Sequence, residues 1–200
     1  MLNYGFRKST DDVDAIIRST SVMKEAINIV GERQGLPNGW LNMDFKNTES
    51  YSDKLIGVAK HYKTFSNILD VKIIDNEYLV AMKLRSGRSY KKDMSDIVGI
   101  ILENKNNGEE ITKEKIEKAF IYLYDDINKM PKNSKIIYNE IFNVENLKLL
   151  FDKKREKEIK TKVVLDDFKQ MFPDEIRKVG MENIMKNIDE IIDREEKKEP

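Results

Sequence analysis

The sequence predicts an α+β protein in which a mixed β-sheet with flanking helices is followed by an all-helical C-terminal region. Two observations support this prediction. The first half alternates short strand-like runs with helical segments, whereas apolar residues recur at helical spacing through the second half. A polar, glycine-containing stretch at 105–110 separates the two patterns, so we expect one domain at 1–104 and a helical region at 105–200.

The composition excludes several classes of site. The 200-residue chain is long enough to bury a core, and its 36 basic residues balance its 36 acidic residues, so a nucleic acid would have to meet a local basic patch. The absence of cysteine excludes disulfides, thiolate metal sites and cysteine nucleophiles. No run approaches the roughly 20 apolar residues of a membrane span, and the N-terminus lacks the order of a signal peptide. We therefore expect a cytoplasmic protein that engages no membrane.

A strand-like run near the N-terminus carries two aspartates on either side of one apolar residue. Side chains alternate along a strand, so Asp12 and Asp14 would share one face while Val13, Ala15 and Ile17 face a core. Adjacent carboxylates are costly to hold together unless a cation neutralises them, and Mg²⁺ bound through oxygens is the usual solution. The alternative is an acidic strand edge without a metal.

A helix of about three turns is expected next. Hydroxyl residues at 19–21 can cap its start, and Gly31 and Gly35 are expected to end it. A turn at 36–39 then leads to Trp40, which we expect to anchor the core rather than to stack on a base.

A β-hairpin should follow, because residues 61–65 and 69–74 favour strands and a short connector joins them. We expect this hairpin to extend the sheet of the first strand. On its second arm, Asp70, Lys72 and Ile74 share one face. Asp70 is therefore a candidate third carboxylate, and the alternative is a turn residue at the start of the strand.

Two apolar helices with a basic loop between them complete the first half. The first helix, at 77–85, ends in Lys83 and Arg85, and the loop carries Arg88. Asp93 opens the second helix, either as an N-cap or as a site residue. The cations are candidates for phosphate contacts, and the plain alternative is a solvated loop.

The second half is expected to be helical throughout. Thr112 can cap one helix and Ser134 the next. Further helical segments are expected at 146–155 and 165–172, and Pro173 can open a last helix. Interleaved acidic and basic residues are typical of a solvated helical bundle.

Four segments together resemble a known family. They are Arg7-x-x-Thr10-x-Asp12-Val13-Asp14, Leu36-Pro37-x-x-Trp40-Leu41-Asn42, Tyr78-Leu79-x-Ala81-Met82-Lys83-Leu84-x-x-x-Arg88 and Lys92-Asp93-x-x-Asp96-Ile97. In this order they resemble the bacterial nucleotidyltransferases of the DNA polymerase β-like superfamily, in the branch related to abortive-infection nucleotidyltransferase toxins. The resemblance covers residues 4 to about 102.

The resemblance implies a nucleotidyltransferase-like fold that transfers a nucleotidyl group from a nucleoside triphosphate to an acceptor hydroxyl, with Mg²⁺. Asp12 and Asp14 would bind the metal, and we expect Asp70 to complete the cluster or to activate the acceptor. The residues expected to bind the nucleotide are Arg7, Thr10, Lys83, Arg85, Arg88 and Asp93. In the toxin branch the acceptor is RNA, such as tRNA, or a protein side chain, and a cognate antitoxin is the expected partner.

The superfamily's Gly-Gly or Gly-Ser segment, which cradles the triphosphate, has no counterpart before Arg7. A truncated chain, a start placed too late and a loss of catalysis each explain this. Three functions therefore stay open. They are an active nucleotidyltransferase of a toxin–antitoxin or phage-defence system, a degenerate member that binds without transfer, and an interaction protein whose charged clusters are caps and surface charge.

Overall fold

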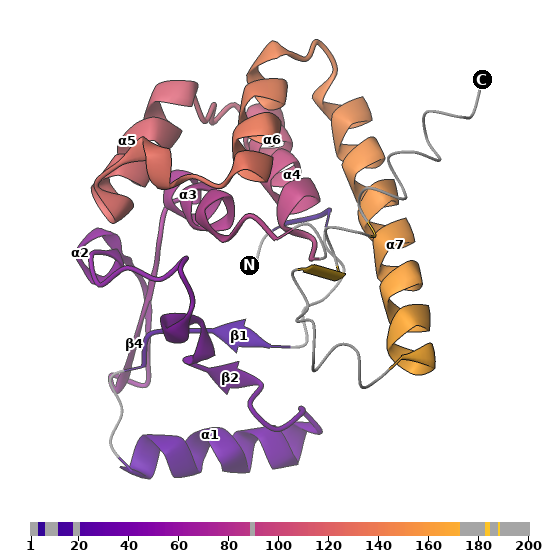
Figure 1. Cartoon of the computed structure of the whole chain (residues 1–200). Helices are drawn as coiled ribbons and strands as arrows, with labels where there is room; N and C mark the ends of the chain where they lie inside the picture. The colour runs from indigo at the N-terminus through magenta and orange to yellow at the C-terminus, as the bar shows by residue number, and fades with distance from the viewer. Residues whose placement is uncertain are drawn as a thin grey trace. The chain divides into compact units, whose positions relative to one another are not determined.

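The computed structural model describes residues 4–6, 12–17, 21–88, 91–172, 183–184 and 188. Across these residues the protein is mixed α+β and mostly helical, with two small sheets of two strands each (Figure 1). The expected α+β class is therefore confirmed.

The chain forms two compact units. The first contains residues 1–86 and 111–129, and the second contains residues 87–110 and 130–200. Each unit draws on both sides of the expected boundary between 104 and 105.

In the first unit, β1 (Val13–Asp14) and β2 (Leu41–Asn42) run side by side in parallel (Figure 1). The Val13 N–H donates to the Trp40 carbonyl at 2.6 Å, and the Ala15 N–H donates to the Asn42 carbonyl at 2.9 Å. Val13 is 46% exposed, so the expectation that it faces a core is wrong. Two strands of two residues offer little surface on which a second layer can pack.

The expected helix is α1 (Ser21–Gln34), which ends at Gly35 with φ +63°. Gly31 does not end it but lies buried within it, where an added Cβ would stand 2.9 Å from the Trp40 ring. The indole Nε1 of Trp40 donates to the Ile27 carbonyl at 3.1 Å. Trp40 therefore packs as a structural anchor between α1 and β2.

The expected hairpin is present as β3 (Lys60–Phe65) and β4 (Leu69–Ile73), paired antiparallel. Ser66 and Asn67 have positive φ, as a tight hairpin turn requires. The hairpin forms a sheet of its own, so the expectation that it extends the sheet of β1 is wrong for the described strands. Its ladder has a register shift between His61 and Lys63, and such bulges twist a strand and disfavour further pairing at its edge.

Two helices form the core of the first unit, α3 (Asn76–Ser86) and α5 (Lys113–Tyr124), which pack on each other. Their buried hydrophobic side chains are Val80, Ala81, Leu84, Ile116, Ala119, Phe120, Leu123 and Tyr124. Thr112 caps α5 as expected, since its hydroxyl accepts the Lys115 N–H at 3.3 Å. Asp125, with φ 70°, ends the helix, and the short 3-10 helix η2 (Ile127–Lys129) follows it. The connecting elements η1 (Asp44–Asn47) and α2 (Leu55–Val58) precede the hairpin.

The second unit contains α4 (Asp93–Asn106), α6 (Lys132–Asn143) and α7 (Leu147–Met171), and α4 packs on both other helices. Pro131, and not Ser134, stands at the N-cap of α6. Ser134 lies inside that helix and is fully buried. Pro131 precedes the helix with fixed φ, which suits a helix start.

The segments expected at 146–155 and 165–172 are one continuous helix, α7, capped by the Asn146 side chain. Five of the nine residues between them, at 156–164, are Lys or Glu, which are good helix formers and allow the helix to continue. The helix expected from Pro173 lies outside the described residues except at three positions, of which Ile184 and Ile188 are buried. No helix within the described ranges is long and apolar enough to cross a membrane.

Candidate functional site

The aspartate pair lies at the first sheet, where Asp12 directly precedes β1 and Asp14 ends it. The hydrogen bonds of Val13 and Ala15 to β2 hold this segment extended, so the side chains of Asp12 and Asp14 share the face opposite to Val13 and Ala15. Both aspartates are exposed. Both carboxylates are thus open to solvent, and their joint site stays a prediction.

Mg²⁺ fits these two residues. It prefers oxygen ligands, retains several waters, and is commonly held by one or two carboxylates together with substrate phosphates. Among the residues that the structure describes, no group of three or more His, Cys, Asp or Glu side chains is placed to hold a metal. A pair of aspartates completed by water and phosphate needs no such group.

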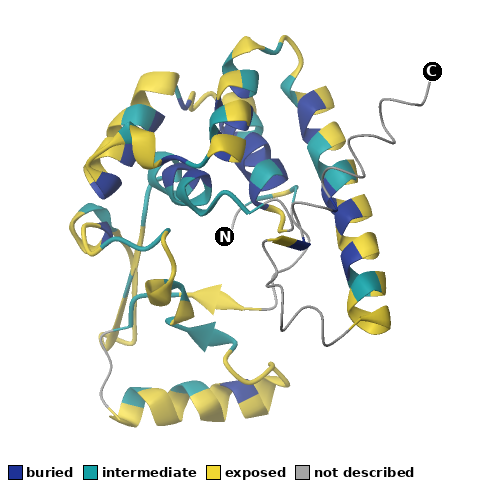
Figure 2. Ribbon diagram, in the orientation of Figure 1, coloured by how far each residue is buried: buried dark blue, intermediate teal, exposed yellow. Residues whose placement is uncertain are grey.

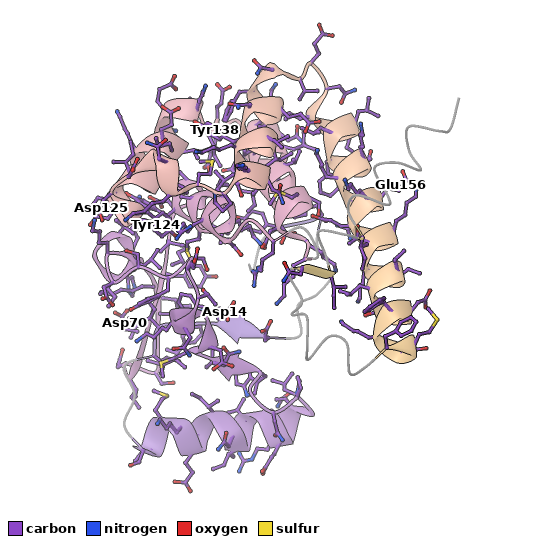
Figure 3. The ribbon with its side chains drawn as sticks, viewed as in Figure 1. Asp14, Asp70, Tyr124, Asp125, Tyr138 and Glu156 are labelled. Carbon is purple, nitrogen blue, oxygen red and sulfur yellow. The ribbon has the colours of Figure 1, made fainter. Side chains whose placement is uncertain are left out.

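Asp70 lies apart from the pair in chain and sheet, on β4 of the hairpin, and Figure 3 shows Asp14 and Asp70 on these separate elements. His61 Nδ1 is 2.7 Å from Asp70 Oδ1, and the Thr64 hydroxyl donates to the same oxygen at 3.4 Å. The structure therefore gives Asp70 partners on β3 and does not bring it into a three-carboxylate cluster with Asp12 and Asp14.

The cations of α3 differ in their surroundings. Arg85 donates through one guanidinium nitrogen to the Lys129 carbonyl at 2.8 Å, and its other terminal nitrogen lies 2.8 Å from a Glu49 carboxylate oxygen. Arg85 therefore ties η2 and the segment after η1 to the end of α3. Lys83 is partly buried one half-turn earlier, and it stays the candidate phosphate contact on this helix.

Arg88 and Asp93 form an ion pair in the second unit. Arg88 Nε donates to one Asp93 carboxylate oxygen at 2.9 Å, and Asp93 is 3% exposed. Lys92, and not Asp93, stands at the N-cap of α4, so the N-cap interpretation of Asp93 is wrong. The first residue of α4 is Asp93 itself, one residue earlier than an N-cap at Asp93 would require. The Asp93 carboxylate faces the Arg88 guanidinium. Arg7 and Thr10 lie outside the described residues.

One polar contact was not foreseen from the sequence. Glu158, in the middle of α7, is buried, and its carboxylate accepts the Ser95 backbone N–H at 2.9 Å and the Ser95 hydroxyl. Burial raises the pKa of Glu158 to about 7, and the negative charges of Asp96 and Asp93 act in the same direction. Glu158 stands in a strongly charged run, which gives no sequence signal that one member points inward.

Comparison with protein-family models, with curated proteins and with solved structures found no match to this chain. The class that the structure itself defines is an α+β protein with an exposed aspartate pair beside a short parallel strand pair. Inferences about chemistry therefore depend on the arrangement of these residues.

Proposed function

We propose that the chain is a metal-dependent nucleotidyltransferase that transfers a nucleotidyl group from a nucleoside triphosphate to a hydroxyl of RNA, such as tRNA, or of a protein. The observation that carries the proposal is the exposed pair Asp12 and Asp14, held on one face of an extended segment. This arrangement supplies two oxygen ligands and leaves the rest of a coordination sphere to phosphate and water.

In the proposed reaction, the acceptor oxygen bonds to the α-phosphorus while the bond from that phosphorus to the β-phosphate oxygen breaks. Pyrophosphate leaves, and the hydroxyl proton passes to a carboxylate. Asp12 and Asp14 would hold Mg²⁺, which would supply positive charge to neutralise the triphosphate. Lys83 is the candidate contact for the phosphates, whereas Asp70, on a separate sheet, takes no part in the step.

The test is transfer of α-labelled nucleoside triphosphates to total RNA or to protein in the presence of Mg²⁺. The D12N/D14N variant removes both charges with little change in size. D152N/D166N is the matched control, because Asp152 is exposed and Asp166 half-buried on α7, and each pairs with a lysine of the same helix. Transfer by the wild type and by the control, but not by D12N/D14N, supports the proposal. Equal transfer by all three overturns it, as does no transfer by any.

A second candidate is a protein that binds nucleotide or a partner without transfer. Its support is that Arg85 and Arg88, both expected on phosphates, each face a carboxylate of the protein. A ligand that binds only the native state raises the melting temperature. Stabilisation by nucleotide and Mg²⁺ without label transfer would favour this second candidate.

The toxin role and the antitoxin partner belong to the same proposal. Induced expression of the wild-type chain should arrest bacterial growth, and D12N/D14N should not. Growth arrest that is equal for both variants would separate toxicity from the aspartate pair and remove this role.

A further inference from the structure

The β3–β4 hairpin is exposed along most of its length (Figure 2). Phe65, Leu69 and Ile73 are each more than 40% exposed, and Ile68 in the turn is 84% exposed. A two-stranded hairpin is marginally stable alone in water and normally gains a further strand, a helix or a ligand on its apolar face. This face is therefore a candidate binding surface.

The register defines which side chains share that face. Phe65 pairs with Leu69, Lys63 with Val71 and Lys60 with Ile73. These six residues, here called the Phe65 face, alternate with the opposite set His61, Thr64, Asp70 and Lys72. The contacts of His61 and Thr64 with Asp70 agree with this assignment.

Charge on the Phe65 face is basic. Lys60 pairs with Asp75 at 2.5 Å. Lys63 has no carboxylate partner within the described part of the chain, and its ammonium lies 5.0 Å from the centre of the Phe65 ring. The face thus combines a half-exposed aromatic ring, an adjacent cation and aliphatic side chains.

This combination is complementary to a polymer that carries both flat aromatic groups and regular negative charge. Exposed rings on a sheet surface stack on unpaired bases, and nearby lysines meet the phosphates. An acidic polypeptide would satisfy Lys63, but it lacks the regular succession of flat rings that can stack on Phe65. The chemistry therefore favours nucleic acid over an acidic protein segment.

We propose that the Phe65 face binds single-stranded nucleic acid, with a base stacked on Phe65 and a phosphate at Lys63. The inference deepens the proposed function, on which it rests for the choice of RNA over DNA, because that function names RNA as an acceptor. Such a surface would hold the acceptor strand.

The test is fluorescence anisotropy with a labelled single-stranded RNA of 12 nucleotides, in the absence of nucleoside triphosphate. We expect F65A to weaken binding about tenfold, the effect of losing one base–aromatic stack. F65L keeps apolar area but removes the ring, and should weaken binding as F65A does, whereas F65W should bind at least as tightly as the wild type. Far-UV circular dichroism of each variant checks that the fold is retained.

The matched charge pair is K63A and K72A, two exposed lysines on opposite faces of one hairpin. K63A should lower the slope of log Kd against log salt concentration by about 0.7, the value for one phosphate contact on a single strand. K72A should leave the slope unchanged. Equal effects of both lysines would mean general electrostatic attraction and would overturn the inference.

Two further probes distinguish sources and failures. Abasic RNA should bind more weakly than normal RNA of the same length, and equal binding would overturn the stacking contact. DNA of the same sequence should also bind more weakly than RNA, and a preference for DNA would overturn the choice of RNA. D12N/D14N should bind RNA as the wild type does. If F65A binds RNA normally and still transfers label, this inference is overturned and the proposed function is not. If RNA binding depends on Phe65 but the wild type transfers no label, this inference is supported and the proposed function fails.

Discussion

Glu158 of α7 caps the N-terminus of α4 through Ser95. The carboxylate accepts the Ser95 N–H at 2.9 Å and the Ser95 hydroxyl, although the two residues are 63 positions apart in the chain. The Ser95 N–H is among the donors that the first turn of a helix leaves without an intrahelical partner. A buried glutamate from a second helix thus satisfies this donor.

The stability of the second unit should depend on the ionisation of Glu158. Its pKa rises from 4.5 to about 7, so the native state holds a proton over that range that the unfolded chain releases. The contribution of Glu158 is fully present below pH 4.5 and is lost as pH rises through 7, by on the order of 3 kcal/mol. E158Q removes this loss, so its melting temperature relative to the wild type should rise between pH 5 and pH 8. A difference that stays constant over this range would contradict the prediction.

Removing the Ser95 hydroxyl should destabilise the protein and alter the same titration. S95A leaves the buried carboxylate one donor short, which costs about 1 to 3 kcal/mol. Because that hydroxyl lowers the pKa of Glu158, S95A should also raise this pKa further. The control is S134A. Ser134 is also fully buried, but its hydroxyl has no hydrogen-bond partner in the described ranges, so its loss should be neutral or stabilising. Thermal melts across pH give the melting temperature of each variant. The prediction is refuted if S95A and S134A have the same melting temperature at every pH.

Two helical glycines should respond oppositely to alanine. At Gly31 an added Cβ would stand 2.9 Å from the Trp40 ring, so G31A must displace the indole and should cost about 1 to 3 kcal/mol. At Gly57 the nearest atom is the Tyr122 hydroxyl at 3.4 Å, which is an ordinary contact. G57A should therefore be neutral or stabilise by about 0.5 kcal/mol through the unfolded state. Urea unfolding measures the free energy of unfolding of both variants. Equal values would show that the Trp40 indole can move aside without loss of stability.

Local patterns predicted the elements whose causes lie within a few residues. The apolar run of α3, the Thr112 cap of α5 and the turn at 66–67 are all encoded by neighbouring side chains. The separation of the two sheets was not predictable in this way, since strand pairing depends on distant segments. Gly31 appeared to be a helix end because its partner, Trp40, lies beyond the helix.

The candidate site shows the same division. Alternation along a strand predicted that Asp12 and Asp14 share a face; both are exposed, but Val13 on the other face is exposed as well, so the shared site stays a prediction. The pairing of Arg85 with Glu49 was not predictable, because 36 residues separate them and neither has a distinctive neighbourhood. The buried position of Glu158 was missed for an equivalent reason, since its burial arises from packing of α7 on α4.

The ion pair of Arg88 and Asp93 should contribute to stability, whatever its part in nucleotide binding. Asp93 is 3% exposed, so R88A removes a guanidinium from a buried carboxylate and should cost about 2 kcal/mol or more. R88K keeps the charge but loses the fork of donors, so its effect should be intermediate. The exposed pair of Lys148 and Asp152 on α7 is the control, and K148A should change stability by less than about 0.5 kcal/mol. Adding D93N to R88A should recover part of the loss, because the buried negative charge is then gone. Urea unfolding measures the free energy of unfolding of each variant. If R88A and K148A lose the same amount, the ion pair does not stabilise the fold and Arg88 is available for another partner. Nucleotide titration of R88A would then be the informative measurement.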